Sequence, residues 1–455
     1  MKTIAQIAAE LAGYDPQALS AAGVNDFLER LVQPVAGTEA VGVFAALDRV
    51  LAGDIVSPLN VPPHDNSAMD GYAFDGSQLR AGEPLSLRCV GTALAGAAWA
   101  GTVGAGDCVK IMTGAVMPAG TDTVVPQELT TQDPGTKPCI HIAADVLRPG
   151  DNRRLMGEDL MHGQVALAGG TRLGPAALGL LASLGLLQVT VVRRLRVAYF
   201  STGDEILSLG EPPREGAVYD SNRYTVFGLL TRLGVEVIDL GVVKDDPALL
   251  EAAFREAATR ADAIITSGGV SAGEADHTRA MMSQLGDVAF WRIAMRPGRP
   301  MAVGRIGCAE LQAKLASSAY TSSASSYQKH SNQDALSESA VLFGLPGNPV
   351  AVMVTFLAFV RPALLRMMGS TEAAAPLLRA VCTEPLRKKA GRTEYQRGWV
   401  CTAPDGTLQV RSTGNQGSGM LSSMVQANGL IVLHHAQGPV AAGDVVDVMM
   451  FEGVV

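Results

Sequence analysis

The chain has 455 residues, and its 44 Asp and Glu residues outnumber 36 Lys and Arg residues, which gives a formal net charge of −8. This charge argues against a general nucleic-acid-binding or anionic-membrane surface, so an anionic ligand has to meet a local cluster of cations. The length predicts several domains, because single cores rarely grow past roughly 250–300 residues. The six cysteines form no CxxC pair, which indicates neither a zinc knuckle nor a disulfide framework and fits a reducing cytoplasm.

Residues 1–194 are expected to form an elongated N-terminal region. A helical pattern over residues 41–51 ends before Gly53, and a proline-rich polar loop follows at residues 61–72. Short strand candidates separated by glycines then predict an inserted small β-domain at about residues 62–142. The N-terminus lacks the sustained apolar core of a signal peptide, so secretion is not expected.

The segment from Leu173 to Val192 is uncharged over 20 residues, which is long enough to cross a bilayer. Gly174-Pro175 opens this segment, Gly185 interrupts it, and residues 188–192 alternate between polar and apolar as a strand does. We therefore expect a short buried helix followed by a strand, and no membrane insertion.

Residues 195–370 alternate between strand and helix patterns, which predicts a doubly wound, mostly parallel α/β domain with helices on both faces. Within this domain, a serine-rich stretch at about residues 308–340 has few large apolar residues and is expected to be a flexible insertion. Short strands and turns after residue 376 predict a C-terminal β-barrel that extends to residue 455.

Residues 261–276 form an apolar strand that runs into a loop of small residues and ends in two acids. Gly268 and Gly269 let backbone N–H groups approach an anion, Ser271 can donate a hydroxyl, and Asp276 can hold a cation or position water. This pattern is typical of phosphate binding. Taken alone, it fits an ordinary strand-to-helix turn equally well.

Two further strands, at residues 196–205 and 340–349, end in the same style. Open α/β sheets bind ligands at the carboxyl ends of their strands, so three such loops predict one common site. Asn348 is placed to cap the helix that begins near Pro349. Between these loops, the turn at residues 296–300 holds two arginines between prolines, a geometry suited to an oxyanion.

These motifs, in this order, resemble the bacterial MoeA family of molybdopterin molybdenumtransferases, which is related to the E-domain of gephyrin. The resemblance covers nearly the whole chain and rests on residues 65–73, 201–205, 267–276 and 344–349. It implies an enzyme that takes adenylylated molybdopterin and molybdate, uses Mg²⁺, and releases molybdenum cofactor and AMP.

The resemblance also implies the residues of the site. Catalytic roles fall to Asp70, Thr113, Asp159, Glu205, Asp245 and Asp276, of which Glu205, Asp245 and Asp276 would hold the metal. Substrate binding falls to Arg154, Thr202, Gly268, Gly269, Ser271, Arg296, Pro297, Arg299, Pro346, Asn348, Pro349, Arg392 and Ser418. Arginine replaces the lysines common in the family at residues 296 and 299, which changes how an oxyanion is contacted.

Plainer roles stay open for several of these residues. Glu205 and Asp276 could be solvated loop acids, Arg392 and Ser418 could be surface hairpin residues, and Asp246, beside Asp245, fits a helix cap. Asp70 and Thr113 could each belong to a simple turn or strand end.

The resemblance further implies a homodimer with a shared active site, and the cysteine usage places it in the cytoplasm. Molybdoenzymes or their chaperones would receive the product, and neither nucleic acid nor a membrane is expected as a partner. Three alternative functions remain, namely a molybdopterin adenylyltransferase, a CinA-like nucleotide hydrolase, and a scaffold protein that has lost catalysis. The first two share only the α/β core, and a fold by itself does not fix a reaction.

Overall fold

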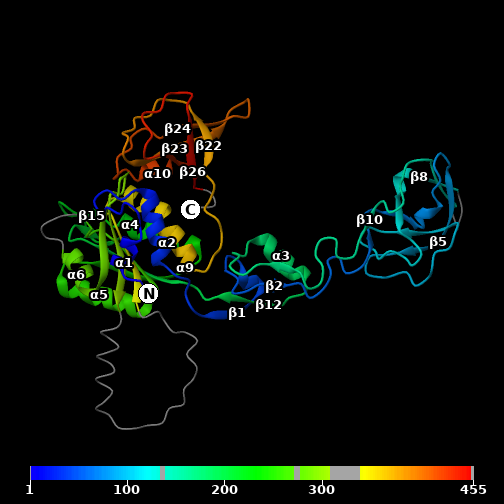
Figure 1. Ribbon diagram of the computed structural model, residues 1–455, viewed down its shortest axis with the longest axis horizontal. Helices are drawn as coiled ribbons and strands as arrows, with labels where there is room; N and C mark the ends of the chain where they lie inside the picture. The colour runs from blue at the N-terminus through cyan, green and yellow to red at the C-terminus, as the bar shows by residue number, and fades with distance from the viewer. Residues whose placement is uncertain (1, 134–138, 271–276, 308–338, 452–455) are drawn as a thin grey trace, which may run out of the picture. The chain divides into compact units, whose positions relative to one another are not determined.

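The computed structural model describes residues 2–133, 139–270, 277–307 and 339–451. The chain forms two compact units. Figure 1 labels helices and strands of both. Unit 1 comprises residues 1–52, 170–174 and 189–455, and unit 2 comprises residues 53–169 and 175–188. The predicted division into three regions is not tested by these two units and remains a prediction. The part of the serine-rich stretch at residues 308–338 lies outside the described residues.

A six-stranded sheet with the order β16-β13-β17-β21-β20-β18 forms the centre of unit 1. The first four strands are parallel, and β20 and β18 are antiparallel to their neighbours. The strands span Glu236–Val243 (β16), Arg196–Thr202 (β13), Ala263–Ser267 (β17), Ser339–Leu345 (β21), Pro300–Gly307 (β20) and Gly286–Arg292 (β18). The predicted mostly parallel α/β domain is confirmed.

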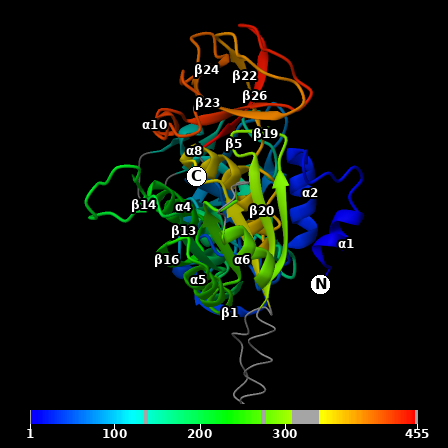
Figure 2. The same ribbon diagram turned by 90° about the vertical axis from the view of Figure 1, so that its left-hand side faces the viewer.

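Helices cover both faces of this sheet because both faces of its central strands are apolar. Val197 and Tyr199 of β13 point into one hydrophobic core, and Ala198 and Phe200 point into another. The first core includes residues of α1 (Ile4–Ala9), α2 (Ala21–Leu31), α4 (Ser221–Leu233), α8 (Pro349–Thr355), a π-helical turn (Phe356–Val360) and α9 (Arg361–Met367). The second includes residues of α5 (Pro247–Arg260) and α6 (His277–Leu285), and Figure 2 shows these helices and β20.

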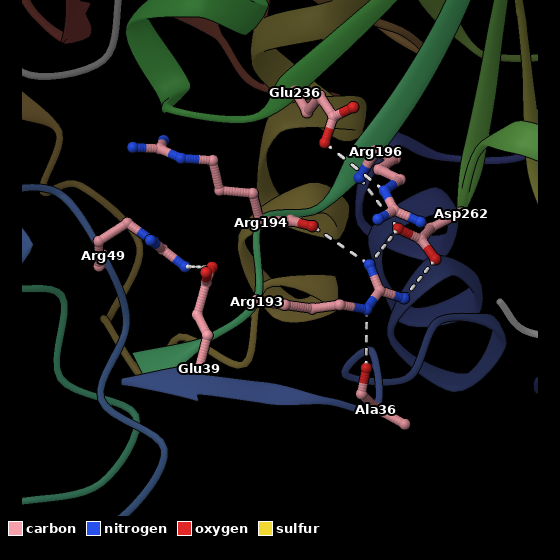
Figure 3. A network of polar contacts seen from close by, with 8 residues as sticks. All are labelled: Ala36, Glu39, Arg49, Arg193, Arg194, Arg196, Glu236 and Asp262. Carbon is pink, nitrogen blue, oxygen red and sulfur yellow. Dashed lines mark hydrogen bonds and ion pairs between the residues drawn. The ribbon is translucent and has the colours of Figure 1, made fainter. Parts of the chain in front are cut away.

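A buried ion pair fixes the chain where it enters β13 (Figure 3). The guanidinium of Arg193 donates to both carboxylate oxygens of Asp262, over 2.8 and 2.7 Å, and to the carbonyl oxygen of Ala36 over 2.9 Å. The same carboxylate accepts from the backbone N–H of Arg196 at 2.9 Å. The N-terminal segment is thereby tied to the amino ends of β13 and β17.

The uncharged segment after Leu173 forms α3 (Pro175–Ser183) and β12 (Gln188–Val192), so the predicted helix followed by a strand is confirmed. The expected burial of the helix is wrong, because Leu181 is its one buried residue. β12 pairs with β1 (Thr38–Gly42). A different helical run, Pro349–Met367, is long and apolar enough to cross a bilayer, but 72% of its most apolar window is buried in the fold, as in a core helix.

The C-terminal part of unit 1 is a closed barrel, as predicted. Its strands are β23 (Thr393–Thr402), β24 (Leu408–Ser412), β22 (Leu378–Cys382), β26 (Val445–Met450) and β25 (Gly429–Leu433). The short helix α10 (Ser422–Val425) lies between β24 and β25 in the chain. The pairing of β23 with β25 closes the barrel. The short strand β19 (Met295–Arg296) pairs in parallel with β23, which ties Arg296 to the barrel.

Unit 2 is built around a second six-stranded sheet with the order β7-β4-β6-β5-β9-β8. The strands span Thr123–Pro126 (β7), Gly71–Phe74 (β4), Asp107–Ile111 (β6), Leu85–Ala93 (β5), Cys139–Ile142 (β9) and Thr130–Gln132 (β8). Two small antiparallel strand pairs accompany it, β3 (Asn66–Ser67) with β10 (Arg153–Arg154) and β2 (Ile55–Val56) with β11 (Val165–Leu167). The short strands expected between residues 62 and 142 are therefore present.

Candidate functional site

A cleft of about 280 Å³ in unit 1 is lined by six of the residues singled out in the sequence. These are Arg296, Pro297, Arg299, Pro346, Asn348 and Ser418. They come from the segment around β19, the loop after β21, and the loop after β24. The α/β domain and the barrel, which are joined by the β19–β23 pairing, thus both contribute to the cleft.

A second group of predicted residues gathers where β13, β16 and β17 end. The hydroxyls of Thr202 and Thr278 lie 3.3 Å apart, and Thr278 in turn donates to a carboxylate oxygen of Asp245 over 3.3 Å. The backbone N–H of Asp245 donates to a carboxylate oxygen of Asp204 at 3.3 Å, one residue before Glu205. Three acids from two loops therefore lie at this edge of the sheet.

The loop after β17 links these two groups. The backbone N–H of Gly268 donates to the carbonyl of Leu345 at 3.1 Å, and a Cβ atom built on Gly347 would lie 4.0 Å from the Cα of Gly268. Parallel strands bring their carboxyl ends to one edge, so this proximity follows from the sheet order. Ser271 and Asp276, also predicted here, lie outside the described residues.

Gly268 and Gly269 have to be glycines for reasons of space. Both have positive φ, and an added Cβ would lie 2.4 Å from the carbonyl oxygen of Thr202 at Gly268 and 2.3 Å from the Cβ of Thr278 at Gly269. The backbone at Gly268 and Gly269 therefore packs directly on the end of β13 and the start of α6.

The cleft is positively charged. The side chains of Arg296 and Arg299 are exposed, and neither has a carboxylate partner in the described part of the chain. Behind them Arg397 is buried, and burial together with repulsion from Arg296 lowers its pKa to about 10. Clustered guanidinium groups repel one another, and an oxyanion bound between them would relieve that repulsion.

Arg397 also shapes the cleft. Its guanidinium donates to the backbone carbonyls of Asn415 and Gly417, at 3.2 and 2.9 Å, and to the hydroxyl of Ser423 at 2.9 Å. These contacts position the loop that carries Gln416 and Ser418 into the cleft. The sequence analysis missed Arg397, and an isolated arginine in a strand gives no signal of such a role.

Arg392 lies near the cleft without lining it. Its guanidinium pairs with the buried carboxylate of Glu394 at 2.8 Å, and Glu394 is the register partner of Arg296 on β19. An anion that reached Arg392 would compete with this internal partner.

Two expectations about helix caps had opposite outcomes. Asp246 accepts hydrogen bonds from the backbone N–H groups of Ala248 and Leu249 at the start of α5, so its role as a cap is confirmed. Asn348 does occupy the cap position before Pro349, but its side chain makes no capping hydrogen bond and lines the cleft instead. The expected capping by this side chain is wrong.

Asp220 and Asn222 belong to this region and were also missed. The side-chain amide of Asn222 donates to the carbonyl of Gly347 at 2.7 Å, and Asp220 caps α4 by accepting from the N–H of Arg223 at 3.0 Å. The other side-chain oxygens of both residues are buried and accept from no donor of the described chain. The Asp-Ser-Asn sequence before an apolar helix was the available signal, but it reads first as a helix start.

The residues predicted from the N-terminal half lie in unit 2. Asp70 accepts hydrogen bonds from the N–H and the hydroxyl of Thr113, both at 2.7 Å, and these bonds lower the pKa of its carboxyl. Arg154 is an exposed residue of β10, and the N–H of the exposed Asp159 donates to the carbonyl of Val61 at 3.1 Å. The predicted pairing of these residues with the cleft in a dimer stays a prediction.

Comparisons with known proteins cover most of the chain. Three family models match it: the MoeA N-terminal region (domains I and II) at residues 19–185, a probable molybdopterin-binding domain at residues 198–366, and the MoeA C-terminal region (domain IV) at residues 379–451.

Individual relatives agree with these models. The chain is 40% identical to a molybdopterin molybdenumtransferase of Haemophilus influenzae over 94% of this chain and 97% of the relative. It is 34% identical to a protein of that name from Nostoc, over 89% and 87% of the two chains. A crystal structure of the molybdopterin biosynthesis MoeA protein from Pyrococcus horikoshii superposes with a TM-score of 0.72 at 25% identity, over 95% of this chain and all of that one. The chain belongs to the MoeA family of molybdopterin molybdenumtransferases.

Proposed function

We propose that this chain is a transferase of molybdenum cofactor biosynthesis that inserts molybdate into adenylylated molybdopterin and releases AMP. The observation that carries the proposal is the cleft in which Arg296 and Arg299 face the loops after β21 and β24. The substrates of this reaction are molybdate, which is a tetrahedral dianion, and a pterin that carries phosphate groups. Guanidinium groups without a carboxylate partner are suited to binding both.

Different loops would bind different parts of the substrates. Arg296 and Arg299 would hold molybdate or the terminal phosphate, and Asn348 and Ser418 would donate to the remaining oxygens. The backbone around Gly268 and Gly269 would approach the phosphate groups, since no side chain fits there. Thr202 lies next to this backbone and would add a hydroxyl.

The buried acceptors offer a site for the pterin. Amino and ring N–H groups of a pterin are hydrogen-bond donors, and the free oxygens of Asp220 and Asn222 are acceptors without a partner in the described chain. Buried polar atoms are usually hydrogen-bonded, so a ligand donor would satisfy them. Asn222 would at the same time hold Gly347 in place through its amide.

Mg²⁺ fits the acids at the strand ends. Magnesium prefers oxygen ligands, often one or two carboxylates together with phosphate oxygens. Asp245 and Glu205, on neighbouring loops, would supply the carboxylates. Asp276, which lies outside the described residues, is the third predicted ligand. When bound there, the ion would neutralise phosphate charge. Thr278, which donates to Asp245, would keep that carboxylate oriented towards it.

We also propose that the active protein is a cytoplasmic homodimer in which Asp70, Thr113, Arg154 and Asp159 of one subunit complete the site of the other. The exposed apolar side chains of Phe44 and Leu187, which are 100% and 89% accessible, are candidates for burial in such a dimer. Sedimentation would give the mass of the active species, and full activity from a monomer would contradict this part. The product would pass to molybdoenzymes or their chaperones.

The test is to incubate the chain with adenylylated molybdopterin, molybdate and Mg²⁺ and to measure AMP. Release of AMP together with molybdenum cofactor supports the proposal. Adenylylation of molybdopterin from ATP would instead support an adenylyltransferase, and hydrolysis of unrelated nucleotides a CinA-like hydrolase. Matches to the MoeA N-terminal and C-terminal regions disfavour both alternatives and, with the acids at the strand ends, a scaffold without catalysis.

A further inference from the structure

Three side chains with different metal-binding atoms lie together on the sheet of unit 2, whose strands β5 and β8 are labelled in Figure 1. A carboxylate oxygen of Asp133, the sulfur of Cys139 and a ring nitrogen of His141 all lie within 4.8 Å of one another. We propose that these residues form a binding site for a divalent ion of the zinc type. The proposal is separate from molybdate insertion, which involves other residues.

The sheet itself brings the three residues together. Cys139 and His141 are two residues apart on β9, so their side chains share a face. Asp133 follows β8, and its backbone N–H donates to the carbonyl of Cys139 at 3.1 Å, which places it opposite Cys139. Ile140 and Ile142 fill the core on the other face, so Cys139 and His141 cannot turn inward.

The distances suit a tetrahedral ion. The Nε2 atom of His141 lies 3.2 Å from a carboxylate oxygen of Asp133. Two such atoms bound about 2.0–2.2 Å from one Zn²⁺ at a tetrahedral angle would be about 3.4 Å apart. Small rotations of the half-exposed side chains can therefore bring the thiol into the same shell.

A simple ion pair between His141 and Asp133 would not account for the nearby thiol of Cys139. His434 and Asp447 on the barrel form a similar pair, with the ring nitrogen 2.6 Å from the carboxylate, but no third donor of this kind joins them within the described residues. A thiolate has no role in a His–Asp pair, whereas a Cys, His and Asp set is a common donor combination for zinc.

The surroundings of His141 favour metal binding. The hydroxyl of Ser86 on β5 lies 2.9 Å from its Nδ1 atom. When Nδ1 carries the proton and donates to Ser86, Nε2 keeps its lone pair for a metal, as second-shell partners of zinc-bound histidines commonly ensure. Arg88 lies opposite Cys139 on β5, and its guanidinium pairs at 2.9 Å with Asp107 on the neighbouring strand β6. The charge of Arg88 is therefore already paired and does not have to be neutralised at the metal site.

The site would be accessible and incomplete. The side chains of His141 and Asp133 are 40% and 64% exposed, so an ion could enter and leave. Three protein ligands leave a fourth position to water or another small ligand, as in open zinc sites. An exchangeable ion held in this way would be removed by chelators.

Co²⁺ is the probe, because its bonds to cysteine give a charge-transfer absorption in the near ultraviolet and tetrahedral coordination gives intense visible bands. The full-length chain, stripped with a chelator, is titrated with Co²⁺ and the metal is then displaced by Zn²⁺. We expect one equivalent of Co²⁺ with both signals, and displacement by Zn²⁺. The absence of a thiolate band in the wild-type chain would overturn the proposal.

Variants locate the site. Cys139→Ser should abolish the thiolate band, and His141→Gln and Asp133→Asn should each weaken Co²⁺ binding by more than the roughly tenfold expected for Ser86→Ala. Cys401→Ser and His434→Gln are matched controls and should change nothing. Asp133 is exposed, so its variant tests the site even if a substitution on β9 impairs folding. An unchanged band in Cys139→Ser, or unchanged affinity in Asp133→Asn, contradicts the assignment.

Discussion

Asn222 donates its side-chain amide to the backbone carbonyl of Gly347 over 2.7 Å, so the first turn of α4 holds the loop that follows β21. That loop carries Pro346 and Asn348 into the cleft. The side chain of Asn222, more than a hundred residues away in sequence, thus holds the loop that lines one side of the cleft.

Asn222→Ala should therefore impair substrate binding more than folding. Loss of a buried hydrogen bond that leaves its partner unsatisfied costs about 1–3 kcal/mol, and a misplaced loop should raise the KM for adenylylated molybdopterin roughly tenfold. Steady-state AMP release and chemical denaturation measure the two effects. The exposed Asn25 of α2 provides the control, whose alanine variant should stay within about 0.5 kcal/mol of wild type. An unchanged KM in Asn222→Ala would contradict the positioning role.

Arg296→Gln should weaken molybdate use. Hydrogen bonds to charged groups contribute about 1.5–3 kcal/mol, so the molybdate concentration at half-maximal rate should rise at least about tenfold. Arg296→Lys keeps the charge but loses the planar guanidinium. Its molybdate concentration at half-maximal rate should therefore lie between those of wild type and Arg296→Gln. Arg379→Gln, an exposed arginine on the barrel strand β22, should have no effect. Equal molybdate dependence in Arg296→Gln and wild type would remove Arg296 from the site.

Asp262→Asn should destabilise unit 1 without acting on the cleft directly. The carboxylate of Asp262 is buried against the guanidinium of Arg193, and breaking a buried pair costs about 3–5 kcal/mol. Denaturant unfolding measures this loss. The exposed pair of Arg260 and Glu256 on α5 is the comparison, and Glu256→Gln should cost less than about 0.5 kcal/mol. Similar losses in both variants would show that burial of the first pair does not matter.

Cys89 should be a reactive thiol at neutral pH. A hydrogen bond from Cys108 lowers the pKa of Cys89 to about 6, whereas the ordinary value is 9.0. Because the thiolate is favoured in the folded state, its contribution to stability is full above pH 9 and is lost as the pH falls through about 6. Alkylation of Cys89 by iodoacetamide, followed by peptide mass spectrometry, should therefore rise with a midpoint near pH 6. Cys108→Ser should move the midpoint upward, and an unchanged midpoint would refute the cause.

The sequence was sufficient for the α/β sheet and the barrel because their patterns are local. The helical pattern over residues 41–51 was misleading, because the chain there forms the end of β1 and a short 3-10 turn (Val43–Ala46). Alternating strand and helix periods specify a covered parallel sheet, and the carboxyl ends of such strands must meet at one edge. Thr202, Gly268 and Pro346 could therefore be assigned to one region before any coordinates. The role of Asp245 came from resemblance to a family, whereas the arginines of the 296–300 turn indicated an oxyanion on their own. Both roles remain predictions.

What the sequence left out depends on contacts between distant segments. Arg397 acts through backbone carbonyls on another loop, and Asn222 through a carbonyl after a different strand. Neither contact leaves a periodic pattern. Asn348 fitted a helix cap by position, but the direction of its side chain is set by the cleft. Asp133, Cys139 and His141 became neighbours only through the pairing of β8 with β9.

The arginine-lined cleft is proposed to use molybdate to release AMP from adenylylated molybdopterin. The most direct measurement is the rate of AMP release by the full-length chain as molybdate is varied at fixed adenylylated molybdopterin and Mg²⁺. We expect the rate to rise saturably with molybdate, and Arg296→Gln to shift this curve to higher molybdate concentration. A rate independent of molybdate, or no AMP at any molybdate concentration, would contradict it.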